Sequence, residues 1–267
     1  MKRKNNIIKS LVLLFVCSVL FLPSVFAQTD AVKGKETLTY GHVMGRIECE
    51  NKTLTFGYVA FFVAPERMPN PSRYWMSADY VFPLQGYGIF DIALPEGKYY
   101  ALAVQRAQND FGPIDAGEYF YYFMDSKGPI AINVKKGERV DLGFNKMVPM
   151  PSNPFTDVID RKTGGVTTIE GFVRDGKGNP VVGVLVVAHI SMSRRRPDFI
   201  SGRSGSDGSY ELRLPGSGSY YLVARSRLGR PPENGDYQGG VENNMPVTVI
   251  TGETVKVDIM VNQVAIK

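Results

Sequence analysis

The same residue pattern occurs twice in the chain, once in each half. Residues 88–106 read GIFDIALPEGKYYALAVQR, and residues 208–227 read GSYELRLPGSGSYYLVARSR. Both begin with glycine, alternate apolar and polar residues, turn at Leu-Pro and glycine, and continue from Tyr-Tyr into a second alternating run. Alternation with a period of two is typical of a half-buried β-strand, and proline and glycine favour the turn between paired strands. The sequence therefore predicts one β-hairpin in two copies.

The match between the copies extends beyond the hairpin in both directions. Residues 45–47 match 171–173, and residues 129–140 match 246–255. Short apolar runs between turn residues, with no convincing helical periodicity, are typical of β-sandwiches. We therefore expect an all-β fold of two tandem seven-strand-type β-sandwiches. The expected segments are a signal peptide at 1–27, an N-terminal tail at 28–36, the first sandwich at 37–146, a Pro/Gly linker at 147–165 and the second sandwich at 166–267.

The first 27 residues have the order of a secretory signal peptide. Four basic residues precede an apolar run over 11–22, and Ala27 supplies a small residue before the cleavage point. The apolar run is short for a membrane span, so we expect no transmembrane helix after cleavage. The expected location is the periplasm, the cell surface or the extracellular space. An uncleaved N-terminal anchor is the alternative.

Cleavage changes both the charge and the cysteine content of the chain. The signal peptide carries four of the 31 basic residues and no acidic residue, which leaves 27 basic and 26 acidic residues. A net charge so close to zero gives no indication of nucleic-acid binding, and we expect none. Cys17 lies in the signal peptide, and the apolar surroundings of Cys49 favour a buried side chain over a reactive thiol.

Several motifs of the second half match a known family. They are residues 169–175, the turn 176–181, the run 204–210, and the pairs Leu214-Pro215 and Tyr220-Tyr221. With them the second unit resembles the carboxypeptidase regulatory-like domain, a transthyretin-like or prealbumin-like β-sandwich. The resemblance implies an extracytoplasmic recognition module within a wider group of carbohydrate-binding-like folds. The first unit fits only through the repeat, and its segment 63–87 departs from the pattern.

Signatures of catalysis and of metal binding are missing from the sequence. His42 and His189 lie in different units, and neither an H-E-x-x-H zinc motif nor a G-x-S-x-G nucleophile motif occurs. The turns at Asp175 and Asp207 lack the closely spaced oxygen ligands of a calcium loop, so we interpret them as structural turns. We expect no enzymatic activity, no cofactor and no metal.

The segment 63–87 is unusually rich in aromatic residues. We select Tyr74, Trp75, Tyr80 and Tyr87 as candidate ligand-binding residues, because exposed aromatic rings can stack on sugar rings. The alternative is that these rings close the open end of the first sandwich. A second aromatic run at 119–123 is interpreted as a strand with one buried side.

Three consecutive basic residues form the other candidate site. Arg194, Arg195 and Arg196 precede Pro197 in a predicted loop between two strands. They are candidates for contact with an anionic surface, and a solvated turn is the alternative.

Three functions are compatible with these observations. The favoured one is an exported, non-catalytic recognition or scaffolding module of the cell envelope or surface, with a surface protein or a polysaccharide as partner. The alternative is a carbohydrate-binding protein that uses the aromatic residues of the first unit. A hydrolase with an unrecognised site is the least favoured.

Overall fold

A computed structural model describes residues 39–50, 53–71, 73–107, 112–150 and 166–266. The predicted signal peptide, the N-terminal tail and the linker residues 151–165 lie outside the described residues. Contacts group Glu36–Lys267 as one compact unit. Its described regular structure is β-strand apart from the short 3-10 helix η2 (Glu242–Asn244), as the all-β prediction requires. Within the described ranges, no helix has the length and apolar character needed to cross a membrane.

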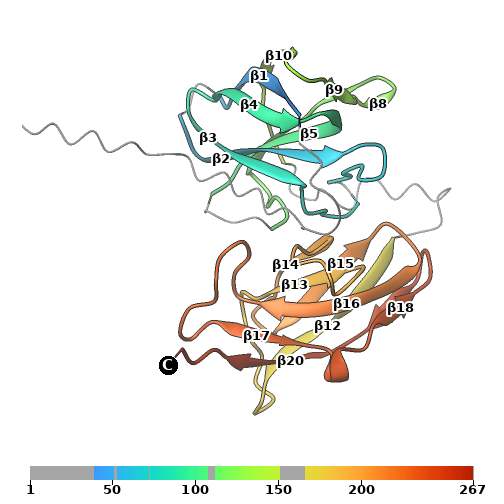
Figure 1. The fold of residues 1–267 in the computed structure, drawn as a ribbon. Helices are drawn as coiled ribbons and strands as arrows, with labels where there is room; N and C mark the ends of the chain where they lie inside the picture. Colours follow the sequence, from blue (N-terminus) through green and yellow to red (C-terminus); the bar gives the residue numbers. More distant parts are fainter. Residues whose placement is uncertain (1–38, 51–52, 72, 108–111, 151–165, 267) are drawn as a thin grey trace, which may run out of the picture. The chain divides into compact units, whose positions relative to one another are not determined.

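The first sandwich is built from two sheets, whose strands are coloured blue to green in Figure 1. One has the order β10-β1-β4, and the other has the order β11-β6-β5-β2-β3 with β9 paired to β5. A small separate pair consists of β7 and β8. The bounds are β1 Tyr40–Glu48, β2 Leu54–Val63, β3 Tyr80–Gly86, β4 Ile89–Pro95, β5 Gly97–Gln105, β6 Tyr119–Tyr122, β7 Met124–Asp125, β8 Gly128–Pro129, β9 Ile132–Val134, β10 Arg139–Lys146 and β11 Val148–Pro149.

The second sandwich follows one path of paired strands, β14-β13-β16-β17-β20-β12-β15, with β18 on β16 and β19 on β12. Its two layers meet at β12, which pairs with β15 through residues 167–172 and with β20 through residues 173–175. The bounds are β12 Thr167–Asp175, β13 Leu185–His189, β14 Phe199–Arg203, β15 Ser209–Leu214, β16 Gly218–Arg225, β17 Tyr237–Gly240, β18 Val247–Val249, β19 Thr254–Lys256 and β20 Ile259–Gln263.

The predicted hairpins are wrong, because β4 does not pair with β5 and β15 does not pair with β16. In each copy the proline and glycine turn instead joins strands that pair with different partners. The surroundings of these strands are nevertheless equivalent in the two copies, which confirms the repeat. β4 pairs antiparallel with β1, and β15 pairs antiparallel with β12. β5 pairs antiparallel with β2, and β16 pairs antiparallel with β13. The parallel partner is also shared, since β10 lies beside β1 and β19 lies beside β12. Two copies of one topology therefore arise from the repeated residue pattern.

Each sandwich encloses its own apolar core. In β4 the side chains of Phe90, Ile92 and Leu94 are buried, and the residues between them are exposed. Tyr210, Leu212 and Leu214 occupy the same positions in β15. This confirms the predicted alternation, which allows one face of a strand to pack inward. Cys49 is 2% exposed within the first core, as predicted for a small buried side chain.

The two predicted structural turns are confirmed by their hydrogen bonds. Asp175 Oδ1 accepts from the backbone N–H of Lys177 at 2.8 Å and of Asn179 at 2.9 Å. Hydrogen bonds from Asn179, its side chain first, hold the pKa of Asp175 below its usual value. In the second turn Gly208 has φ +81°, and a Cβ there would lie 2.6 Å from the Val173 carbonyl oxygen. Glycine is required at that position.

The predicted linker boundary at residue 147 is wrong by a few residues. Met147 is 4% exposed and packs in the first core, and Met150 is 6% exposed. Between them β11 pairs with the edge of β6. Two buried methionines and a strand pairing thus keep residues 147–150 in the first sandwich, because leaving them in a linker would expose their apolar side chains.

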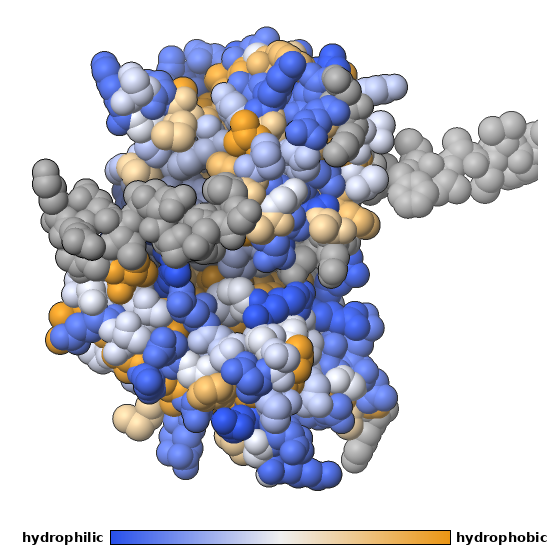
Figure 2. All heavy atoms as spheres, turned by 180° about the vertical axis from the view of Figure 1, so that it is seen from behind, coloured by the Kyte–Doolittle hydropathy of each residue, from blue (hydrophilic) through white to orange (hydrophobic). Residues whose placement is uncertain are grey.

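Hydrophilic side chains cover most of the face shown in Figure 2, and hydrophobic ones are scattered among them in small groups. Apolar residues in small groups are ordinary on a protein surface and do not by themselves mark a site.

Candidate functional site

A third apolar cluster, which we call the junction, contains residues from both sandwiches. It is contributed by the outer faces of β2, β5 and β13, which are the faces turned away from the sandwich cores, together with nearby connections. Its buried members are Tyr58, Ala60, Phe62, Trp75, Ala78, Tyr100, Leu102, Val104, Ile114, Met150, Leu185, Val187 and Ile200. These three strands are therefore buried on both faces, and the two sandwiches share an apolar interface.

The connection between β2 and β3 reaches across the junction to the edge of β14. The Ser77 N–H donates to the Asp198 carbonyl oxygen at 3.0 Å, and the Ile200 N–H donates to the Trp75 carbonyl oxygen at 3.0 Å. Met76 forms an antiparallel bridge with Phe199 between these two hydrogen bonds. A segment of the first sandwich thus satisfies the exposed edge of a strand in the second, which is how strand addition works between separate chains.

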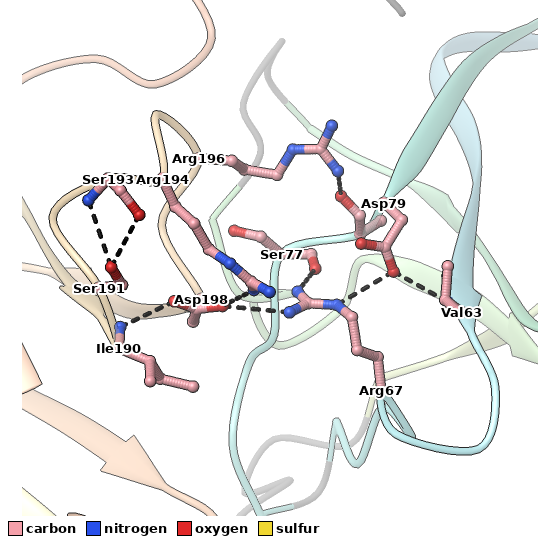
Figure 3. A network of polar contacts seen from close by, with 11 residues as sticks. Val63, Arg67, Ser77, Asp79, Ile190, Ser191, Ser193, Arg194, Arg196 and Asp198 are labelled. Carbon is pink, nitrogen blue, oxygen red and sulfur yellow. Dashed lines mark hydrogen bonds and ion pairs between the residues drawn. The ribbon is translucent and has the colours of Figure 1, made fainter. Parts of the chain in front are cut away.

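A network of ion pairs reinforces this contact, as Figure 3 shows. Arg67, in the β2–β3 connection, lies 3.1 Å from Asp198 Oδ1 and 3.0 Å from Asp79 Oδ2. It also donates from a guanidinium nitrogen to the Ser77 carbonyl oxygen at 2.6 Å. Asp198 is 1% exposed and accepts a further hydrogen bond from the Ile190 N–H at 2.8 Å. A buried carboxylate is tolerated because charged donors surround it.

The predicted arginine cluster is divided between this network and the surface. Arg194 lies 2.9 Å from Asp198 Oδ1, and Arg196 donates to the Ala78 carbonyl oxygen (Figure 3). Arg195 is exposed. Two of the three side chains therefore hold the junction. Contact of the cluster with an anionic surface stays a prediction that now depends mainly on Arg195 and on the exposed half of Arg194.

Two of the predicted aromatic residues lie in one cleft of about 520 Å³, which we call the aromatic cleft. Tyr74 and Trp75 form part of its wall, and Trp75 is only 7% exposed. The Tyr74 ring packs edge-to-face on Phe199 with the centroids 5.8 Å apart, and burial raises the pKa of Tyr74. Polar groups of the cleft are the carboxylates of Asp115, Glu170 and Glu211 and the guanidinium groups of Arg203 and Arg213.

The other two predicted aromatic residues do not join this cleft. Tyr80 begins β3 and packs against the first core, with its ring 5.8 Å from that of Tyr99. Tyr87 follows the end of β3 and is 72% exposed. Ligand binding by Tyr74, Trp75, Tyr80 and Tyr87 together as one surface therefore lacks the required geometry, and each residue has its own surroundings.

Sequence reasoning missed the residues that organise the junction and its margin. Arg67 and Asp198 gave no local motif, because their partners are far away in the chain. Arg225 passed unnoticed, and His189 was considered only for catalysis and metal binding, although both line a hollow beside Arg194 and Arg195. One signal was available, since the continuous apolar runs 58–62 and 185–188 indicate strands that are buried on both faces.

In the part of the chain that the structure describes, histidine, cysteine, aspartate and glutamate side chains form no group of three that suits a metal ion.

No family model matches this chain, and no curated protein matches it. Similar solved structures include the Bacillus anthracis TIE protein, at 16% identity over 85% of this chain and 34% of that one, with a TM-score of 0.25. A leucine-rich repeat protein of Bacteroides thetaiotaomicron matches at 14% identity over 83% of this chain and 26% of its own, with a TM-score of 0.23. The minor pilin of Streptococcus agalactiae matches at 13% identity over 86% and 98%, with a TM-score of 0.27.

The chain thus spans about a third or less of the first two of these proteins. At these TM-scores the similarities carry no argument about function. The resemblance of the second unit to carboxypeptidase regulatory-like domains stays a prediction.

Proposed function

We propose that the protein is an exported, non-catalytic recognition and scaffolding module of the cell envelope or surface. The observation that carries this proposal is the junction, in which an apolar interface and a buried ion-pair network join the two sandwiches. Two sandwiches joined in this way hold their outer loops in a fixed relation, which suits a protein that presents surfaces to a partner. The signal-like N-terminus supports export.

The residues of the junction are used for structure. Asp198 is committed to Arg67, Arg194 and the Ile190 N–H, so neither of its oxygens is left available for proton transfer. Its burial and partners resemble a structural ion pair more than a catalytic acid. This supports a scaffolding role for the most deeply buried charges of the molecule.

A comparison of two variants in binding to isolated native envelope tests the proposal. Arg67→Met removes the cation that joins the sandwiches, and Lys127→Met removes an exposed cation of the first sandwich. We expect the wild type and Lys127→Met to bind the same envelope component at equal affinity, and Arg67→Met to bind it more weakly. Mass spectrometry of the bound component should show no change in its covalent structure. A changed mass of the bound component would indicate an enzyme. Equal affinity of all three proteins would show that binding does not depend on the junction.

A carbohydrate-binding role is the second candidate, and the aromatic cleft is the observation that favours it. Saccharide sites combine an aromatic wall with polar side chains that bind hydroxyl groups, and Tyr74, Trp75 and the carboxylates of this cleft provide both. Since Trp75 is the single tryptophan of the chain, its fluorescence reports on this cleft alone.

Neutral oligosaccharides provide the test for the second candidate. Saturable quenching of Trp75 fluorescence, lost in Glu211→Gln and kept in the exposed control Glu253→Gln, would support saccharide binding in the cleft. Absence of quenching across a panel of neutral oligosaccharides would contradict saccharide binding in the cleft, and the scaffolding proposal would then stand alone.

A further inference from the structure

Besides the aromatic cleft, the structure has a hollow of about 470 Å³ on the outer face of the second sandwich. All of the charged side chains that line this hollow are positive. We call it the cationic hollow. Its cationic or protonatable side chains are His189, Arg194, Arg195 and Arg225, and no aspartate or glutamate is among the residues that line it. Its volume lies within the range of small-molecule sites, about 300–1,000 Å³.

Strand register explains why residues distant in sequence meet here. β13 and β16 pair with Leu185 opposite Arg225 and His189 opposite Tyr221, and β16 and β17 pair with Arg225 opposite Gln238. Alternation places Arg225 and Gln238 on the outer face, whereas Ala224, the neighbour of Arg225 in β16, belongs to the core. The β13–β14 connection, with Arg194 and Arg195, closes one side.

The positive charge of the hollow is only partly balanced by the protein. Arg194 is paired with Asp198, which is itself shared with Arg67. By contrast, Arg225 Nε and His189 Nδ1 are buried and have no hydrogen-bond partner among the described residues. Burial lowers the pKa of Arg225, and burial followed by the charge of Arg225 lowers the pKa of His189. Both shifts have burial as their first cause, and an oxyanion bound beside these groups would oppose both of them.

The remaining lining is suited to a small organic molecule. Met192 and Val223 offer apolar surface, and Gln238 and Asn244 offer amide groups at the margin. Gly240 lies opposite Val223 in the register, so no side chain projects over this part of the sheet. A Cβ at Gly240 would lie 2.9 Å from the Leu222 carbonyl oxygen, which keeps this position open.

We propose that the cationic hollow binds one oxyanion group, a carboxylate or a phosphate, of a small molecule such as an acidic sugar. Arg225 and Arg195 would donate hydrogen bonds to the oxyanion, because a guanidinium presents paired N–H groups that match such oxygens. Met192 and Val223 would contact the apolar part of the ligand. This site lies within the second sandwich and does not depend on the proposed scaffolding function.

Calorimetric titration at low ionic strength tests the proposal with three probes: glucuronate, inorganic phosphate and neutral glucose. We expect glucuronate or phosphate to bind and glucose to give no saturable heat. Tighter binding of glucuronate would identify a carboxylate ligand, tighter binding of phosphate would identify a phosphate ligand, and either result supports the site. If neither anion binds more tightly than glucose, the proposal is overturned.

Two matched charge deletions locate the binding. Arg225→Gln should weaken the affinity for the bound anion by about tenfold or more, since a charge-assisted hydrogen-bond pair is lost. Arg230→Gln removes an exposed charge outside the lining and should change the affinity by less than about twofold. Equal losses in both variants would reduce the effect to general electrostatic attraction and overturn the site.

A second variant and a spectroscopic signal allow the site to be tested even if Arg225→Gln misfolds. If Arg225→Gln does not fold, Arg195→Gln at the exposed rim replaces it, with an expected loss of about threefold or more. The nitrogen chemical shifts of the His189 ring should follow the titration, because an anion beside Arg225 raises the pKa of His189. Unchanged His189 signals during saturable binding would place the anion elsewhere and refute the proposal.

Discussion

The two copies of the repeat bury the same outer sheet face, but they cover it with different side chains. In the first sandwich β2 and β5 cover that face with Tyr58, Phe62 and Tyr100. In the second sandwich β13 uses the smaller Leu185 and Val187, and the face continues past them to His189 of β13 and Arg225 of β16. One face is therefore filled by aromatic rings, and the other leaves room for a charged hollow. A shared topology does not fix what its surfaces do.

The connections that follow β2 and β13 show a similar contrast. They occupy the same place in the repeat, since β3 pairs with β2 as β14 pairs with β13. In the first copy the connection is long and carries Arg67 and the residues that bridge to β14. In the second copy it carries Asp198, which pairs with both Arg67 and Arg194. The two copies thus meet through equivalent connections, and the ion pair between Arg67 and Asp198 joins them.

The largest expected effect comes from removing the carboxylate on which this contact depends. Asp198→Ala leaves Arg67 without its buried partner, so we expect the free energy of unfolding to fall by about 3–5 kcal/mol. Urea denaturation measures this fall in the free energy of unfolding. The double variant Asp198→Leu with Arg67→Met should recover much of the loss, because two apolar side chains replace the pair. A double variant as unstable as Asp198→Ala would show that the charges themselves are required.

Neighbouring valines of β13 offer a sharper comparison of core and junction. Val186 packs in the second core and Val187 packs in the junction, and both are fully buried. Changing either to alanine should cost about 2 kcal/mol, from lost apolar contacts and a residual cavity.

Only Val187→Ala, the junction variant, should weaken the contact between the two sandwiches. Limited proteolysis should therefore cleave Val187→Ala between the sandwiches faster than Val186→Ala at equal global stability. Indistinguishable cleavage patterns would mean that the junction does not depend on this outer face.

Sequence reasoning recovered the local features of this fold and missed the long-range ones. The strand alternation, the repeat and the turns at Asp175 and Asp207 can be read from the sequence pattern, and the structure bears them out. The predicted hairpin pairing is wrong, because proline and glycine indicate that the chain turns but not which strands pair afterwards. The junction depends on Arg67 and Asp198, which are 131 positions apart and match no motif. Trp75 was selected because aromatic rings suit ligand contact, yet its 7% exposure reflects packing between the sandwiches.

A smaller effect should appear in the pH dependence of stability. Burial lowers the pKa of folded His189 from the usual 6.5, and Arg225 adds to the shift, while Asp198 and the backbone of Arg194 and Arg196 oppose it. As the pH falls below 6.5, the unfolded chain takes up a proton that the folded chain excludes. The free energy of unfolding should therefore decrease toward the folded pKa, by at most about 1.4 kcal/mol per pH unit for this group.

His189→Gln isolates this contribution from those of the carboxylates. The difference in the free energy of unfolding between wild type and His189→Gln should change between pH 7 and pH 5 and should be constant above pH 7.5. A constant difference across the whole range would mean that His189 is as easily protonated in the folded state as in the unfolded chain.

The smallest expected effect concerns Tyr87, which shares its residue type and segment with Tyr74 but not its surroundings. Tyr87 is 72% exposed, so Tyr87→Ser should change the free energy of unfolding by no more than about 0.5 kcal/mol. Tyr74→Ser should cost more, because the Tyr74 ring packs on Phe199 and its hydroxyl donates to the Met68 carbonyl oxygen at 3.0 Å. Thermal denaturation of the two variants in parallel measures both. Because Tyr87 is exposed, a loss of saccharide or partner binding in Tyr87→Ser would assign that residue to recognition. Equal destabilisation by both changes would contradict the packing of Tyr74 on Phe199.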